Sequence, residues 1–175
     1  MNDKKIFSTP QGFKDVLNGI YITASGEKLY ANNLLFGFTD VLAQYYNQIT
    51  TQEHEYIKTV DFKYNEPVDK AVIEKIWSTQ YKAIANLNTL LAYIDKKQEV
   101  FSSDAIYRIY KGEALGLRAF MHFDLLRIFS EQITQNPEAA GIPYATQFSL
   151  TAPEFLKAKD VYTCLLYTSP SPRDM

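Results

Sequence analysis

Five polar residues lie inside a strongly apolar stretch of the sequence, KGEALGLRAFMHFDLLRIFS, which runs from Lys111 to Ser130. They are Glu113, Arg118, His122, Asp124 and Arg127. Carboxylates and an imidazole are the groups that general acid–base catalysis or a metal site would need. On a helix, such side chains meet only when they lie three or four residues apart. The spacing therefore decides whether this stretch can do chemistry.

The spacing does not bring these groups together. Glu113 and His122 are nine residues apart, and His122 and Asp124 are two apart, so they point to different faces of a helix. Neither E-x-x-H nor H-x-x-x-H occurs, which are the patterns of a helical metal site. The other histidine, His54, lies between two glutamates in a polar loop, where a solvated charge cluster is the simpler interpretation. We therefore predict a protein that is not an enzyme and has no catalytic residue, metal site or cofactor.

A scaffold helix explains the same stretch better. Asp124 and Arg127 have the i,i+3 spacing of an ion pair. Gly112, Gly116 and Ala119 fall on one face, where small side chains would allow a close helix crossing. The stretch is too highly charged for such a crossing to lie in a membrane. We therefore expect its glycines to mark a tight contact between helices.

Several other polar and aromatic residues receive structural interpretations. Glu113 and Arg118 are expected to brace a neighbouring helix end or bond to nearby backbone. Asn88 falls on or beside an apolar stripe, so its amide is expected to bridge to a neighbouring loop. Trp77 and Tyr81 belong to the same stripe and are expected to pack in the core.

Composition excludes several classes of protein. The formal net charge is −2 and no basic face is clustered, which argues against nucleic-acid binding. No run of 18 apolar residues is present, so no transmembrane helix is expected. Cys164 is the single cysteine, which excludes an intramolecular disulfide and a cysteine-based zinc site.

The apolar periodicity predicts an all-α fold without strands. A helix should begin at Pro10, where the missing N–H of proline costs nothing. One or two shorter helices are expected between residues 27 and 47, broken near Gly37, and a long loop should follow up to Pro67. Two long helices, from Val68 to about Lys97 and from Asp104 to Phe129, should form an antiparallel hairpin. A last helix should begin near Ala158.

An ordered set of motifs carries a family resemblance. In chain order they are T-P-x-x-F-x-x-V-L-N-G-I-Y (Thr9 to Tyr21), D-V-L-A-Q (Asp40 to Gln44), W-x-x-x-Y-x-x-I-x-x-x-N-x-L-L (Trp77 to Leu91), G-E-A-L-x-L-R-A-x-x-H-F-D-L-L-R-x-F (Gly112 to Phe129), G-I-P-Y-A-T (Gly141 to Thr146) and D-V-Y (Asp160 to Tyr162). This set resembles the SusD/RagB family of outer-membrane nutrient-binding lipoproteins.

The resemblance implies a fold, a function and a partner. The fold would be tetratricopeptide-like helix–turn–helix pairs with long irregular loops. The function would be non-catalytic capture of oligosaccharides at the surface of the outer membrane. The partner would be a SusC-like, TonB-dependent transporter, and a lipidated cysteine would provide the only membrane attachment. The alternative is an intracellular helical-repeat module that binds protein, because helix pairs alone do not identify a function.

The chain departs from the family pattern in length and at its end. Family members are longer, and no cysteine before Cys164 could carry the lipid. The ending YTSPSPRDM resembles translated sequencing-adapter DNA, and the alternative is a Ser/Pro-rich terminus. We therefore expect residues 1–163 to be the N-terminal, tetratricopeptide-like part of an incomplete domain. Residues 164–175 would be a non-native tail.

The aromatic-rich loop supplies the candidate ligand residues. Aromatic faces stack on sugar rings while amides and carboxylates bind the hydroxyls, and loops carry binding residues more often than scaffolds do. The candidates are Tyr45, Tyr46, Asn47, Tyr56, Asp61 and Tyr64. The alternative is that these tyrosines cover the helical core or face the transporter.

Overall fold

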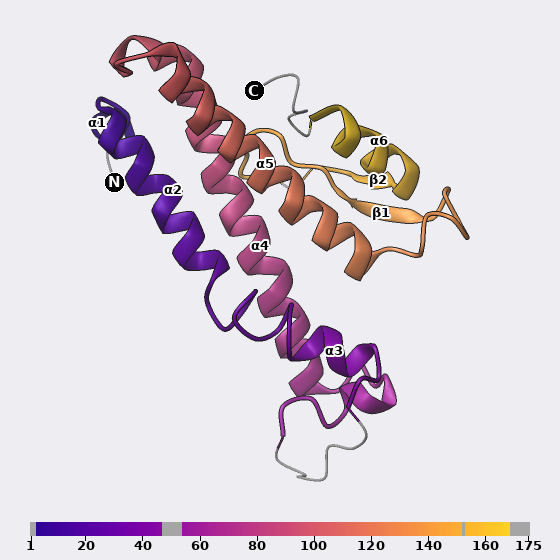
Figure 1. Cartoon of the computed structure of the whole chain (residues 1–175). Coiled ribbons are helices and arrows are strands. Elements are labelled where there is room, and N and C mark those ends of the chain that lie inside the picture. The colour runs from indigo at the N-terminus through magenta and orange to yellow at the C-terminus, as the bar shows by residue number, and fades with distance from the viewer. Residues whose placement is uncertain (1–2, 47–53, 152, 169–175) are drawn as a thin grey trace. The chain divides into compact units, whose positions relative to one another are not determined.

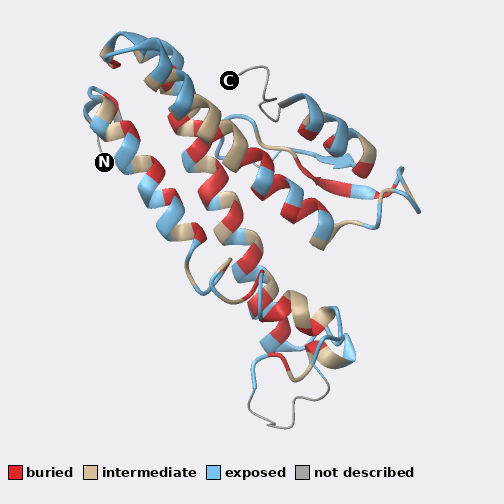
Figure 2. Ribbon diagram, in the orientation of Figure 1, coloured by how far each residue is buried: buried red, intermediate tan, exposed pale blue. Residues whose placement is uncertain are grey.

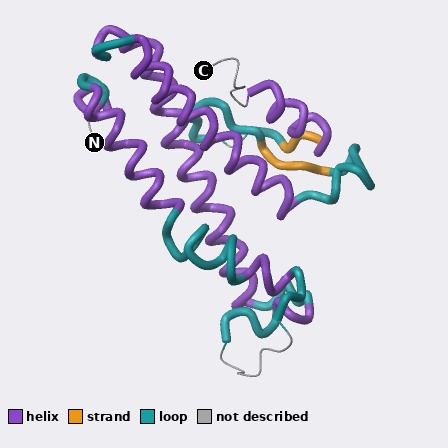
Figure 3. Tube along the Cα trace, viewed as in Figure 1, coloured by secondary structure: helices purple, strands orange, loops and turns teal. Residues whose placement is uncertain are grey.

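The computed structural model describes residues 3–46, 54–151 and 153–168 (Figure 1). Helices make up most of the described chain, which confirms the predicted all-α class (Figure 3). The chain forms two compact units, described separately below. The first combines Met1–Ile20 with Ile84–Met175, and the second is Tyr21–Ala83.

The first unit contains an antiparallel helix hairpin. Helix α4 (Pro67–Ile94), which belongs to this unit from Ile84 onward, is followed by a 3-10 helix (Asp95–Val100) and by α5 (Asp104–Phe129). Arg118 of α5 bonds to Asn88 of α4 at 2.9 Å, and Lys111 of α5 bonds to Asp95 at 2.7 Å. Residues later in α4 therefore pair with residues earlier in α5, so the two helices run antiparallel, as the sequence predicted.

The start of α5 follows from its capping residue. The Ser103 hydroxyl accepts a hydrogen bond from the Ile106 N–H at 3.3 Å, which satisfies one of the free donors of the first turn. The helix runs from Asp104 to Phe129, the bounds that the sequence predicts. Figure 2 shows buried residues along both α5 and α4. The fully buried ones in the two helices of this unit include Leu87, Leu90, Ile94, Met121 and Leu125.

Aromatic contacts join the N-terminal helices to the hairpin. Helix α1 (Asp3–Ile6) is followed by α2 (Pro10–Ala24), which begins at the predicted proline. The Phe7 ring stacks on Tyr93 of α4 with a centroid separation of 4.7 Å, and Phe13 lies 5.1 Å from Phe101. The start of α2 is thereby packed into the core of the first unit.

A small β-hairpin follows α5, where the sequence predicted no strand, so that prediction was wrong. Strands β1 (Ala140–Pro143) and β2 (Phe155–Lys157) are antiparallel and too short to show an alternating pattern. Gly141 allows the close approach, because a Cβ there would lie 2.9 Å from the Leu156 carbonyl oxygen. Helix α6 (Ala158–Thr168) then packs on α5 and β1.

The second unit is less regular than predicted. Residues 27–36 form turns instead of a helix, and only α3 (Phe38–Leu42) is helical before the loop. The Asn33 side chain bonds to the Lys28 carbonyl at 3.1 Å, and such local bonds compete with helix formation. A 3-10 helix, η1 (Thr59–Asp61), packs beside α3, and α4 begins at Pro67.

Candidate functional site

The inward polar residues of α5 hold the first part of the loop that joins β1 to β2. The Arg118 guanidinium donates to the Asn88 side-chain oxygen at 2.9 Å and to the Thr146 carbonyl at 3.2 Å. The Asn88 amide donates to the carbonyls of Ala145 at 2.9 Å and Gln147 at 3.4 Å. Both side chains are buried, so these bonds satisfy groups that have left water.

His122 completes this group and has no free nitrogen for catalysis. Its Nδ1 lies 2.9 Å from the Arg118 carbonyl oxygen, which can only accept, so Nδ1 carries the proton. Its Nε2 therefore accepts the Ala145 N–H at 3.1 Å. Burial lowers the pKa of His122 to about 4, and the ring is neutral at pH 7. Asn88, Arg118 and His122 are called the polar clamp from here on.

Other residues of α5 have local partners or an open surface. Asp124 is buried and accepts a hydrogen bond from Arg127 at 2.5 Å, the i,i+3 pair expected from the sequence. The sequence predicted a close helix crossing at Gly112, and this prediction was wrong within the described chain. A Cβ at Gly112 would meet no atom within 4 Å, so no other helix approaches closely there. Gly112 and Glu113 instead line a surface hollow of about 540 Å³.

Trp77 and Tyr81 lie half-buried in the part of α4 that belongs to the second unit. Their ring centroids are 4.9 Å apart, and burial raises the pKa of Tyr81. The rings contact each other within the helix stripe. A structural role for this pair stays a prediction.

The predicted ligand residues of the second unit separate into exposed and buried groups. Tyr45 is 77% exposed, Tyr46 48% and Tyr64 43%, so their rings reach solvent. The Tyr46 hydroxyl donates to the Phe36 carbonyl at 2.8 Å, which orients that ring. Asn47 lies outside the described residues.

Tyr56 is part of the interior, contrary to its expected ligand role. It is 4% exposed, and its hydroxyl donates to Asn33 at 2.5 Å and accepts from Asn32 at 3.1 Å. Gly37 makes room for it, because a Cβ at that position would lie 2.5 Å from the Tyr56 oxygen. The Tyr56 ring therefore has no face available to a ligand.

Phe62 is an exposed aromatic residue that the sequence interpretation missed. It is 51% exposed, and its backbone has φ 56° and ψ 33°, a left-handed conformation that is uncommon for a bulky residue. Its ring lies 6.2 Å from the Tyr64 ring in an edge-on arrangement. Asp61, a predicted ligand residue, pairs with Lys63 at 2.9 Å, and this bond lowers the pKa of Asp61. The presence of Phe62 in an otherwise polar loop was the sequence signal that could have identified it as a candidate.

A buried acid lies beneath this aromatic segment. Asp69, in the first turn of α4, and Thr59, in η1, are both fully buried. Burial raises the pKa of Asp69, and the adjacent Thr59 hydroxyl opposes that shift. Burial also raises the pKa of Tyr64, with a smaller contribution from the charge of Asp69. Tyr64 is thus close enough to Asp69 to respond to its charge, while part of its ring stays in solvent.

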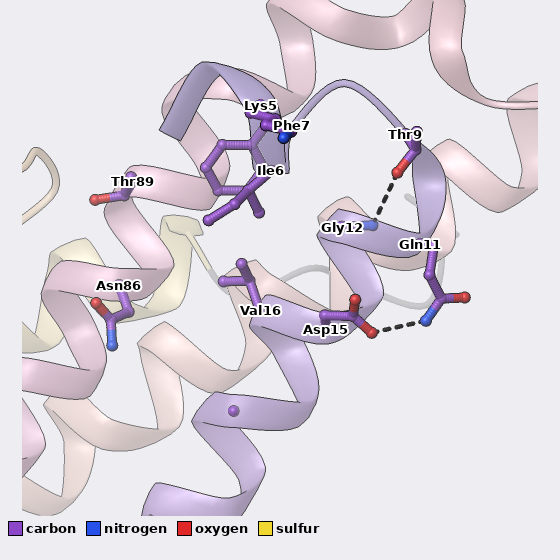
Figure 4. A pocket seen from close by; sticks show the side chains of 11 residues that line it. Lys5, Ile6, Phe7, Thr9, Gln11, Gly12, Asp15, Val16, Asn86 and Thr89 are labelled. Atoms are coloured by element: carbon purple, nitrogen blue, oxygen red, sulfur yellow. Dashed lines mark hydrogen bonds between the residues drawn. The ribbon is translucent and has the colours of Figure 1, made fainter. Parts of the chain in front are cut away.

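The first unit contains a hollow of about 710 Å³ beside α1, α2 and α4 (Figure 4). Ile6 and Val16 point into it, and Asn86 and Thr89 of α4 line its other side. Gln11 and Asp15 bond to each other at its rim at 2.7 Å. None of the predicted ligand residues lines this hollow.

The described residues give no sign of a metal site or a membrane span. No three His, Cys, Asp or Glu side chains gather there as a metal would require. None of the described helices combines the length and the apolarity that crossing a membrane needs.

Comparison with known proteins identifies the family. Residues 1–162 match the SusD-like family described as "Starch-binding associating with outer membrane". A comparison with curated proteins gives no match. The structure is similar to solved structures from Bacteroides, which share its fold.

One is a SusD superfamily protein from Bacteroides fragilis, with 20% identity and a TM-score of 0.73 over 93% of this chain and 38% of that one. Another is a putative sugar binding protein from Bacteroides vulgatus, with 22% identity and a TM-score of 0.75 over 92% of this chain and 36% of that one. The chain thus spans little more than a third of the length of these proteins. Since the family match covers nearly all of its own sequence, the chain belongs to the SusD-like family.

Proposed function

We propose that the protein binds neutral oligosaccharides at the bacterial outer membrane without transforming them. Support comes from the description of its family as starch-binding and from a structural relative titled a sugar binding protein. The observation that carries the proposal is the exposure of four aromatic side chains in the second unit, Tyr45, Tyr46, Phe62 and Tyr64, which are together called the platform. Aromatic faces that remain in water favour stacking on sugar rings over core packing. The neutral, fully bonded His122 supports the non-catalytic part of the proposal.

Alanine substitution in the platform tests this proposal. Tyr45→Ala and Tyr64→Ala should each weaken maltoheptaose binding by about tenfold, equivalent to about 1.4 kcal/mol, measured by isothermal titration calorimetry. Tyr162→Ala is the matched control, because Tyr162 is similarly exposed at 38% but belongs to the first unit. Unchanged binding in both platform variants would reject this assignment of the site.

Delivery to a transporter is the second part of the proposal. The bound oligosaccharide would pass to a SusC-like, TonB-dependent transporter in the same membrane. The outer-membrane association in the family description supports this location. Co-purification of such a transporter with the protein from outer-membrane extracts tests the idea, and recovery without any transporter would count against it.

A further inference from the structure

We propose that Gln44 is a positioning residue that joins two aromatic pairs into one surface for an oligosaccharide several units long. The inference rests on the proposed function, because it concerns the same platform. The first pair is Tyr45 and Tyr46, and the second is Phe62 and Tyr64. The two pairs lie on different segments of the chain. They can form one surface only if a contact between those segments fixes the position of one pair relative to the other.

The contacts of Gln44 provide that connection. Its side-chain amide donates to the Val41 carbonyl at 3.2 Å and to the Val60 carbonyl at 3.3 Å. Val41 lies in α3 and Val60 lies in η1, two elements that pack together. One side chain therefore binds the main chain of both segments.

The backbone of Gln44 also has an unusual conformation. Its φ is 57°, and Gln44 and Phe62 are the two non-glycine residues with positive φ in the described chain. Both lie in the second unit, and each is adjacent to or part of an aromatic pair. Such conformations persist only where the surroundings hold them, and they concentrate at binding sites. The two side-chain bonds of Gln44 are such a constraint.

Each aromatic pair is ordered by its own contacts. Tyr45 and Tyr46 directly follow Gln44, and the Tyr46 hydroxyl is fixed by its bond to Phe36. Phe62 lies two residues after Val60, and its N–H donates to the Thr59 carbonyl at 3.0 Å. The Gln44–Val60 bond therefore connects the two pairs at their bases.

The charge around the platform favours a neutral ligand. Asp61 and Lys63, which flank Phe62, neutralise each other in an ion pair. The exposed groups of the two pairs are phenol and phenyl rings, which stack on the C–H face of a sugar without requiring charge. Two pairs held together act as linked sites, and the second stacking event then benefits from a high effective concentration. A short oligosaccharide that reaches one pair gains nothing from this linkage.

The dependence of binding on chain length separates positioning from direct contact. Maltotriose and maltoheptaose are titrated calorimetrically into the full chain and into Gln44→Gly. Glycine adopts positive φ freely but has no side chain, so this variant removes the two bonds alone. The wild type should bind maltoheptaose at least tenfold more tightly than maltotriose. Gln44→Gly should lose that advantage and keep its maltotriose affinity within twofold.

Three outcomes would overturn the inference. A Gln44→Gly variant that keeps the chain-length advantage would show that Gln44 does not join the pairs. Equal weakening of both sugars would show a general loss of structure. A wild type that binds neither sugar would reject the proposed function itself. The matched control is Gln135→Gly, at an exposed turn in the first unit, which should leave both affinities unchanged. Gln44→Asn, shorter and tolerant of positive φ, replaces Gln44→Gly if that variant does not fold.

Discussion

His122 is fully buried, and both of its ring nitrogens bond to the backbone. Its protonated nitrogen donates to the Arg118 carbonyl, and its other nitrogen accepts from the Ala145 amide. A second proton would destroy the latter bond and place a charge near the Arg118 guanidinium. The neutral form is therefore part of the folded state.

The stability of the protein should consequently depend on pH through His122. Its pKa is 6.5 when unfolded and about 4 when folded, so the unfolded state takes up the proton first as pH falls. The contribution is complete above pH 6.5 and is lost as pH falls towards 4, by up to roughly 3 kcal/mol. Urea unfolding between pH 7 and 4.5 measures this slope. His122→Gln should flatten it, and an equally steep slope in that variant would assign the effect to carboxylates.

At the scale of the element, α5 depends on its first turn. Ser103→Ala removes the acceptor for the Ile106 N–H and should lower the free energy of unfolding by about 1 kcal/mol. Ser102→Ala, at the exposed neighbouring position, is the matched control and should change it by less than about 0.5 kcal/mol. Chemical denaturation of both variants gives the comparison. Equal effects would mean that Ser103 does not cap the helix.

The sequence predicted those elements whose signals are local. The bounds of α5 follow from a capping serine and from continuous helical periodicity, both readable within one segment. The burial of Tyr56 depends on Asn32 and Asn33, more than twenty residues away, so periodicity could not reveal it. The path of residues 145–147 likewise depends on Asn88 of α4. Tertiary hydrogen bonds therefore determine these two features, and a local pattern shows neither the burial of Tyr56 nor which loop Asn88 bonds.

At the scale of the whole molecule, the chain presents much apolar surface. Ile109, Phe120 and Phe123 lie on the outer side of α5 and are each more than two-fifths exposed. The solved relatives contain the matched part within longer chains, of which it covers 38% and 36%. The assignment of residues 164–175 to a non-native tail stays a prediction, although α6 continues to Thr168 and buries Leu165.

This apolar surface should make the isolated chain associate with itself. Light scattering coupled to size-exclusion chromatography should show species larger than a monomer at micromolar concentration. The double variant Phe120→Lys and Phe123→Lys should shift the distribution towards monomer, with only a small loss of melting temperature, because about half of each side chain is already exposed. A wild type that is monomeric and unfolds cooperatively would contradict this expectation.

The polar clamp grips main-chain atoms, and this has a consequence for which mutations the protein tolerates. Carbonyls of residues 145–147 and the Ala145 amide are its partners, so the side chains there are not what it recognises. A saturation library should accept many residues at positions 145–147 but few at Asn88, Arg118 and His122. Proline at 145 should be the exception, because it has no N–H to offer His122. The path of residues 145–147 would then be conserved through the side chains of Asn88, Arg118 and His122, while the residues at 145–147 themselves vary.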